Sequence, residues 1–250
     1  MSEKPGKNVC GEDVLQAVRA AYPDNLVDEA VIYDEDSYFG EIREKLYAAL
    51  KTIEGAHLMY DRPPEGRPHW DEGVDPTEDP PSWVEEPGSY AVFFLALRDE
   101  QFEFTSELEE ETLDEDGEPV SVSVPAVGRI GCAVGVSVVG PFAVIVFTEM
   151  EWNDTGSQTL PDIWPRLFTL DFQVLDVESH YTEVFGEEGG AALRNLRDEI
   201  SRILESFGIR VLSKEEFRAP IPKLKTPFAD DAPSNKQAAT VADALFFPMR

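Results

Sequence analysis

The sequence has few of the side chains that hold transition metals. It contains two cysteines, Cys10 and Cys132, and three histidines in 250 residues. The cysteines lie far apart, and neither a C-x-x-C pair nor an H-E-x-x-H motif occurs. A zinc site built from thiolates is therefore excluded, and we expect neither a metal nor a cofactor.

Basic residues are also scarce. Lys and Arg number 21 against 50 Asp and Glu, which gives a formal net charge of −29. Residues 190–250 hold 10 basic and 8 acidic residues, so 11 basic and 42 acidic residues, a net of −31, precede them. Such a field repels the phosphates of nucleic acids and anionic membrane surfaces. It attracts cationic proteins and speeds their encounter, so we expect a basic protein partner.

Motifs of common catalytic sites are missing as well. There is no G-x-S-x-G, no G-x-x-x-x-G-K-[ST], and no G-x-G-x-x-G that opens a helix. Cys10 precedes a predicted helix, whose N-terminus can activate a thiol, and a histidine could serve as its base. The neighbouring Glu12 and Asp13 disfavour the thiolate, however, and Cys132 fits a small core residue.

Carboxylates leave a hydrolase open as an alternative. One acidic group lies at the predicted end of a buried strand, and another acid lies two positions from a histidine on a predicted strand face. These residues are Glu149, Glu151, Asp154, Glu178 and His180. They could act with or without a metal, although an acidic protein also has such groupings by composition alone.

Long uninterrupted apolar runs do not occur. The most apolar stretch, residues 130–147, contains three glycines and Pro141, so it fits two strands better than a membrane span. The first residues, MSEKPGKNVCGED, lack the apolar core of a secretory signal. We therefore expect a cytoplasmic protein without membrane contact.

The apolar patterns that are present predict an α+β fold. Apolar residues recur at helical spacing over residues 12–22, 38–54 and 188–207, and alternate or run together in the segments between. The strand-like segments are YAVFFLALR, QFEFTSELE, VSVSVP, CAVGVSVVG, FAVIVFTEM, RLFTLDFQVLD and IRVLS, with AHLMY as a first strand. We predict a mostly antiparallel sheet of about six to eight strands, with two N-terminal helices and one long C-terminal helix packed on it.

Two regions differ from this pattern. Residues 61–89 contain seven prolines and little apolar periodicity, which predicts a proline-rich acidic loop. Residues 219–250 form a proline-rich tail that ends with the apolar segment TVADALFF, which either docks on its own domain or anchors in a groove of a partner. Residues 1–218 are then expected to form a single globular domain.

The most acidic stretch is a predicted hairpin, residues 106–119. Residues 99–118 contain 11 acids and no Lys or Arg, and Asp116 and Gly117 suit the turn of a hairpin. The side chains that we expect to bind a partner are Glu107, Glu109, Glu110, Glu111, Asp114, Glu115 and Asp116. Two other interpretations are a solvated hairpin that protects a sheet edge and an adaptation to high salt. A calcium loop with Gly117 at its sixth position is rejected, because Ser123 then stands where Glu is needed.

In composition the chain resembles small acidic bacterial proteins that neutralise or recruit a basic partner, such as toxin-immunity proteins. The resemblance covers no motif, so it assigns no residues. The first hypothesis is a non-enzymatic binding protein, immunity-like or inhibitor-like, or an accessory subunit of a bacterial system, whose acidic face engages a basic protein. The alternatives are the carboxylate-based hydrolase and a structural subunit of a larger assembly.

Overall fold

The computed structural model describes residues 10–26, 38–59, 90–113, 119–153, 178–225 and 239–246. These residues form helices around one six-stranded sheet, which confirms the α+β class. The strands are β1 (Ala56–Met59), β2 (Tyr90–Leu97), β3 (Glu103–Leu113), β4 (Pro119–Ser137), β5 (Phe142–Asn153) and β6 (Arg210–Val211). The helices are α1 (Glu12–Ala21), α2 (Tyr38–Leu50), α4 (Glu178–Ser206), α5 (Lys214–Phe217) and α6 (Val241–Leu245), with a 3-10 turn η2 (Glu100–Phe102) between β2 and β3.

The sheet is built around the long strand β4. Its order is β1-β2-β4-β5-β6, and only the β5–β6 pair is parallel. Strands β2 and β3 both run antiparallel to β4, with Ala96 opposite Gly131 and Glu103 opposite Arg129. They therefore lie end to end along the same edge of β4, separated by η2.

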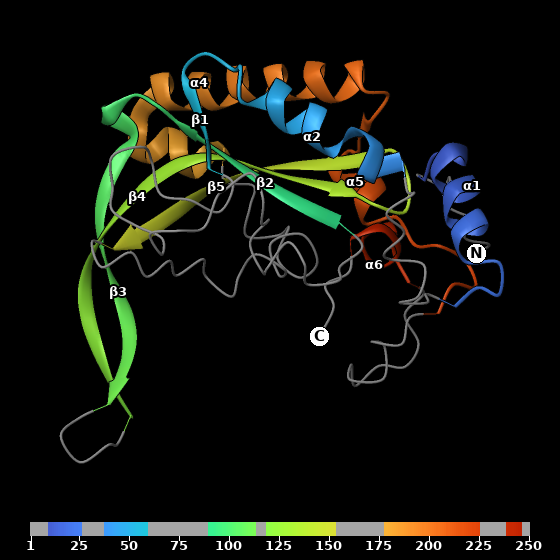
Figure 1. The fold of residues 1–250 in the computed structure, drawn as a ribbon, viewed down its shortest axis with the longest axis horizontal. Coiled ribbons are helices and arrows are strands. Elements are labelled where there is room, and N and C mark those ends of the chain that lie inside the picture. The colour runs from blue at the N-terminus through green and yellow to red at the C-terminus, as the bar shows by residue number, and fades with distance from the viewer. Residues whose placement is uncertain are drawn as a thin grey trace, which may run out of the picture.

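Helices cover both faces of the sheet, because its central strands are apolar on both sides. Leu95, Cys132 and their same-face neighbours pack against α2 and α4 in one cluster of buried residues. Phe94 and Val144 belong to the other cluster, with α1, α5 and α6. Helices α2 and α4 lie on one side of the strands, and α1, α5 and α6 lie on the other (Figure 1).

Helix α4 begins ten residues before the predicted start at Glu188. It changes direction at Gly186, whose φ of 72° and ψ of −176° are not helical. After the helix, Gly208 has a φ of 75°, the left-handed conformation that ends many helices. The bond from the Ile209 N–H to the Leu204 carbonyl, 3.0 Å long, closes this turn.

Two predicted strands are one strand in the structure. VSVSVP and CAVGVSVVG were expected as separate strands, but β4 continues through Pro125, Gly128 and Gly131 without interruption. The strand predicted from RLFTLDFQVLD and the loop of residues 61–89 lie outside the described residues.

The described part of the tail packs on the rest of the chain. Val241, Ala244 and Phe246 are fully buried, and the Tyr22 hydroxyl donates a 2.9 Å hydrogen bond to the Ala244 carbonyl. The Phe246 ring lies 5.4 Å from that of Phe217 in α5. The apolar side of α6 is therefore occupied by its own chain and is not available as a peptide anchor. In the described part of the chain, no helix is long and apolar enough to cross a membrane.

Candidate functional site

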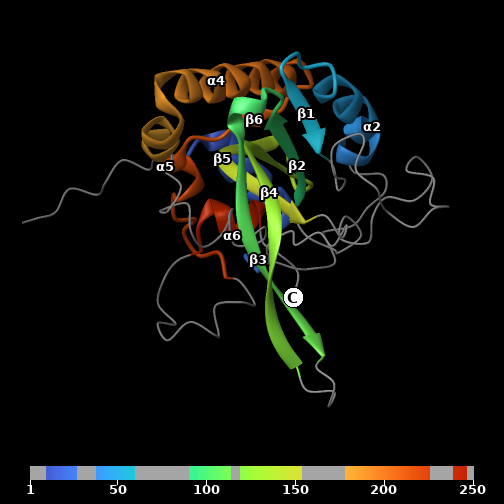
Figure 2. The same cartoon turned by 90° about the vertical axis from the view of Figure 1, so that its left-hand side faces the viewer.

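The β3–β4 hairpin extends well beyond the rest of the sheet (Figures 1 and 2). Strand β5 pairs with β4 only as far as Ala126, which lies opposite Asn153. Residues 107–113 of β3 and 119–125 of β4 pair with each other beyond that point. We call these two segments the ribbon. Strands β3 and β4 pair antiparallel where a hairpin was predicted, and its predicted turn, residues 114–118, lies outside the described residues.

A buried arginine fixes the base of the ribbon to the sheet. Arg129 of β4 lies opposite Glu103 of β3, and its Nη2 and Nε donate to Glu103 Oε2 over 2.8 and 3.2 Å. The third nitrogen, Nη1, donates to the carbonyls of Leu97 and Arg98 over 3.4 and 2.9 Å. Only 11% of the Arg129 side chain is exposed, so its positive charge is buried and paired with Glu103 inside the fold.

Aromatic packing supports the same place. Phe104 lies opposite Gly128, and a Cβ on that glycine would overlap the Phe104 ring. The neighbouring Phe102 in η2 is buried, and its ring contacts Phe185 of α4 edge-on at 6.2 Å. The base of the ribbon is therefore held by β4 on one side and by α4 on the other.

The residues of β4 that lie opposite the acids of the ribbon are not basic. The residues opposite Glu107, Glu109, Glu110 and Glu111 are Pro125, Ser123, Val122 and Ser121. The exposed Ser123 hydroxyl donates a 2.8 Å hydrogen bond to Glu107. Glu107, Glu109, Glu110 and Glu111 thus share one strand, whereas Asp114, Glu115 and Asp116 lie outside the described residues. The ribbon contains no Lys or Arg.

The ribbon also exposes apolar side chains. Val120, Val122 and Val124 alternate along β4, so they share one face of the strand. Val122 is 42% exposed, and the other two are partly exposed. A large apolar side chain at this exposure gains little from folding, and a partner that covered it would gain the burial energy.

Sequence reasoning missed a second ionic cluster. Arg210 of β6 lies between two carboxylates: its Nε is 2.8 Å from Asp13 Oδ2, and its Nη1 donates to Glu216 Oε1 over 2.7 Å. Glu216 also forms a capping box with Ser213 at the start of α5. The cluster joins residues about 200 positions apart in the chain, so no local pattern in the sequence indicates it.

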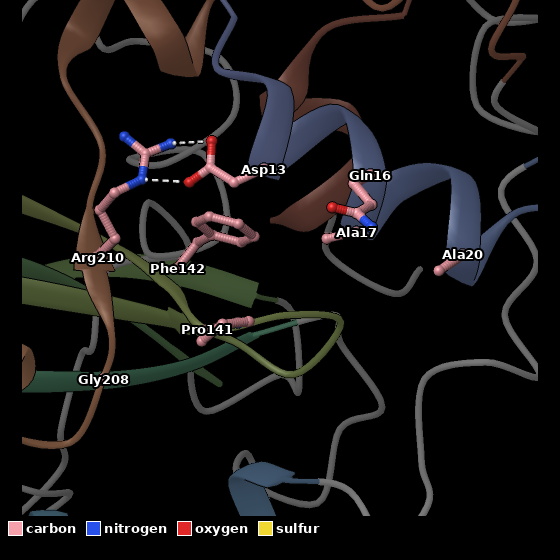
Figure 3. A pocket seen from close by; sticks show the side chains of 8 residues that line it. All are labelled: Asp13, Gln16, Ala17, Ala20, Pro141, Phe142, Gly208 and Arg210. Carbon is pink, nitrogen blue, oxygen red and sulfur yellow. Dashed lines mark hydrogen bonds and ion pairs between the residues drawn. The ribbon is translucent and has the colours of Figure 1, made fainter.

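This cluster borders a pocket of about 350 Å³ between α1 and the β4–β5 turn (Figure 3). Its wall is largely apolar, with Ala17, Pro141 and Phe142, and the Arg210 guanidinium lies 5.5 Å from the Phe142 ring centre. Burial alone disfavours both charges, yet the contacts between them raise the pKa of Arg210 and lower that of Glu216. The pair is ionised at neutral pH and stabilises the packing of α5 against β6.

The structure does not favour Cys10 as a nucleophile. Cys10 is 6% exposed, and burial together with the carboxylates of Glu216 and Asp13 raises the pKa of its thiol. Cys132 is fully buried in the sheet, and burial raises its pKa further. Both thiols are therefore protonated at neutral pH.

The residues of the hydrolase alternative come from two elements. Glu149 and Glu151 belong to β5, and Asp154 lies outside the described residues. Glu178 and His180 were placed on one strand face, but they form the first turn of α4. Residues two apart on a helix point in different directions, so that interpretation was wrong. Within the described ranges, no group of three or more His, Cys, Asp or Glu could hold a metal ion.

Comparisons with protein-family models, with curated proteins and with solved structures found no match to this chain.

Proposed function

We propose that this protein is a non-enzymatic binding protein that engages a basic protein through the ribbon and the acidic residues next to it. The observation that supports it most directly is the contrast along β3. Glu103 at the base has a buried arginine opposite it, whereas Glu107, Glu109, Glu110 and Glu111 have proline, serine or valine.

Charges that stabilise a fold are paired or bound by hydrogen bonds. Carboxylates spaced by one or two residues along a strand repel each other instead, and the ribbon keeps at least four of them without a basic residue of its own. A partner with clustered Lys and Arg would remove this repulsion on binding. Its approach would also be accelerated by the net charge of −29.

The test is a pull-down from a lysate of the native host, at low and at high salt, with three versions of the tagged protein. One is the wild type. The second changes Glu107, Glu109, Glu110 and Glu111 to Gln, and the third makes the same change at four exposed glutamates of α4. These control positions are Glu183, Glu187, Glu188 and Glu205.

Both variants lose the same charge, so a difference between them reports the position of the acids. We expect a protein rich in Lys and Arg to be retained by the wild type and by the α4 variant, and to be lost by the ribbon variant. Raising the salt concentration should release it from the wild type and from the α4 variant. If no basic protein is retained at low salt, or if both variants lose it equally, the proposal is wrong.

The structural-subunit alternative makes a different prediction. A permanent subunit would run with its assembly at high salt as well as low, so the mass of the native particle would exceed that of the 27.9 kDa chain under both conditions. A partner held by charge would leave at high salt.

A further inference from the structure

We propose that the outer edge of β3 is a docking strand, and that it takes an extended basic segment of the partner as an added strand. The inference rests on the proposed function, because it names the way in which the same partner is recognised. It is carried by the pairing of the strands, the positions of two prolines and the charges along one edge.

The outer edge of β3 has no partner among the residues that the structure describes. Along the same side of the sheet, β1 pairs with β2 over residues 94–97. Strand β3 continues this side for 11 residues, from Glu103 to Leu113, and pairs only with β4. An edge of this length offers a row of backbone N–H and C=O groups to another strand.

Two prolines show which backbone groups face outward. Pro119 and Pro125 are six residues apart in β4, and the register with β3 runs without a bulge, so their nitrogens face the same edge. Proline has no N–H, and it fits a ladder only where its nitrogen points away from the paired strand. The outer edge of β4 therefore lacks donors at both ends of the ribbon.

Each residue of β3 opposite one of these prolines belongs to a pair that is not hydrogen-bonded. In such a pair the N–H and C=O groups of both residues point away from the partner strand, so those of β3 point to the outer edge of β3. The residues with this orientation are Glu107, opposite Pro125, and the residues at even spacing from it, namely Thr105, Glu109 and Glu111. No proline interrupts β3. The open edge is thus the one that carries the acids.

The charges decide which strand fits. A second copy of this chain would place glutamates against glutamates, which is unfavourable across strands. A strand with Lys or Arg at alternate positions would pair with Glu107, Glu109 and Glu111. Apolar residues between those positions would extend the face that holds Val122 and Val124. Backbone bonds then give affinity, and the alternating charges give selectivity.

The probe is a short peptide in which lysine and valine alternate, long enough to span β3. Two further peptides are N-methylated, one at each lysine and the other at each valine, so that all three have the same charge. An added strand turns only every second N–H toward β3. We expect one methylated peptide to bind like the parent and the other to bind at least roughly tenfold more weakly, measured by calorimetry at low salt.

A pair of protein variants tests the same edge by changing β3 instead of the peptide. Glu109→Pro and Glu109→Gln remove the same charge, but only the proline removes an outward N–H. We expect Glu109→Pro to weaken the binding of the parent peptide roughly tenfold more than Glu109→Gln does. Far-ultraviolet circular dichroism checks that both variants are folded, and the methylated peptides give an answer on the unchanged protein.

Equal binding of the two methylated peptides would overturn the strand addition, as would no binding of the parent peptide. In either case a basic protein lost only by the ribbon variant in the pull-down would still support the proposed function. A dimer of this chain that Glu109→Pro abolishes, seen by analytical ultracentrifugation, would also overturn the proposal, because a second copy would then occupy the edge.

Discussion

Glu103 and Glu107 lie four residues apart on β3, and we expect opposite results when each is changed to Gln. The Glu103 carboxylate accepts two bonds from a buried arginine and is 35% exposed. A charge-assisted bond contributes about 1.5–3 kcal/mol, and partial exposure reduces this, so Glu103→Gln should lower the free energy of unfolding by about 1–2 kcal/mol. Glu107 is exposed and bonded only to a serine hydroxyl. Its substitution should leave stability within about 0.5 kcal/mol, with any gain due to reduced repulsion.

Urea denaturation followed by circular dichroism measures both changes. A double-mutant cycle of Glu103→Gln with Arg129→Met isolates the pair, and we expect a coupling of about 1–2 kcal/mol. The same cycle with Glu107→Gln should give no coupling, because Arg129 makes no contact with that residue. A loss for Glu107→Gln as large as that for Glu103→Gln would refute the reasoning, since the ribbon acids would then serve the fold.

Three further predictions concern the body of the protein. Gly131→Ala should lower the free energy of unfolding by about 1–3 kcal/mol in urea melts, because the added Cβ would overlap the backbone of β2. Phe246→Ala should cost about 3–5 kcal/mol in the same assay, since the ring is fully buried, and a loss below about 1 kcal/mol would show that the tail does not dock. Arg210→Met should cost about 1 kcal/mol at neutral pH. Because the pKa of Glu216 is lowered in the folded state, that cost should shrink as the pH falls below the ordinary carboxylate range. Urea melts at neutral pH and below that range measure the change, and an equal cost under the two conditions would contradict the prediction.

The sequence predicts the elements whose patterns are local. The stripe of apolar residues in α1 and the alternation in β3 are sufficient to place these elements, and Gly208 marks the end of α4. The capping box of Ser213 and Glu216 is local too, because its two residues are three positions apart. Each of these features depends on residues a few positions apart, so it can be predicted without knowledge of the tertiary structure.

The errors come from contacts between distant residues. VSVSVP and CAVGVSVVG were expected as separate strands, but Gly128 and Gly131 lie inside β4, where a Cβ would overlap Phe104 or the β2 backbone. Glu178 and His180 follow a strand-like pattern, yet they begin α4. The cluster around Arg210 and the pairing of Arg129 with Glu103 both require the tertiary structure. For the same reason, the sequence shows an acidic hairpin but not which of its acids are neutralised.

The most direct test of the account is hydrogen exchange of the protein alone and in complex with the basic protein that the pull-down retains. We expect the amides of β3, including those of Thr105, Glu107, Glu109 and Glu111, to become protected in the complex, while the α4 surface stays unchanged. Protection confined to another surface, with exchange in β3 unaltered, would contradict the account.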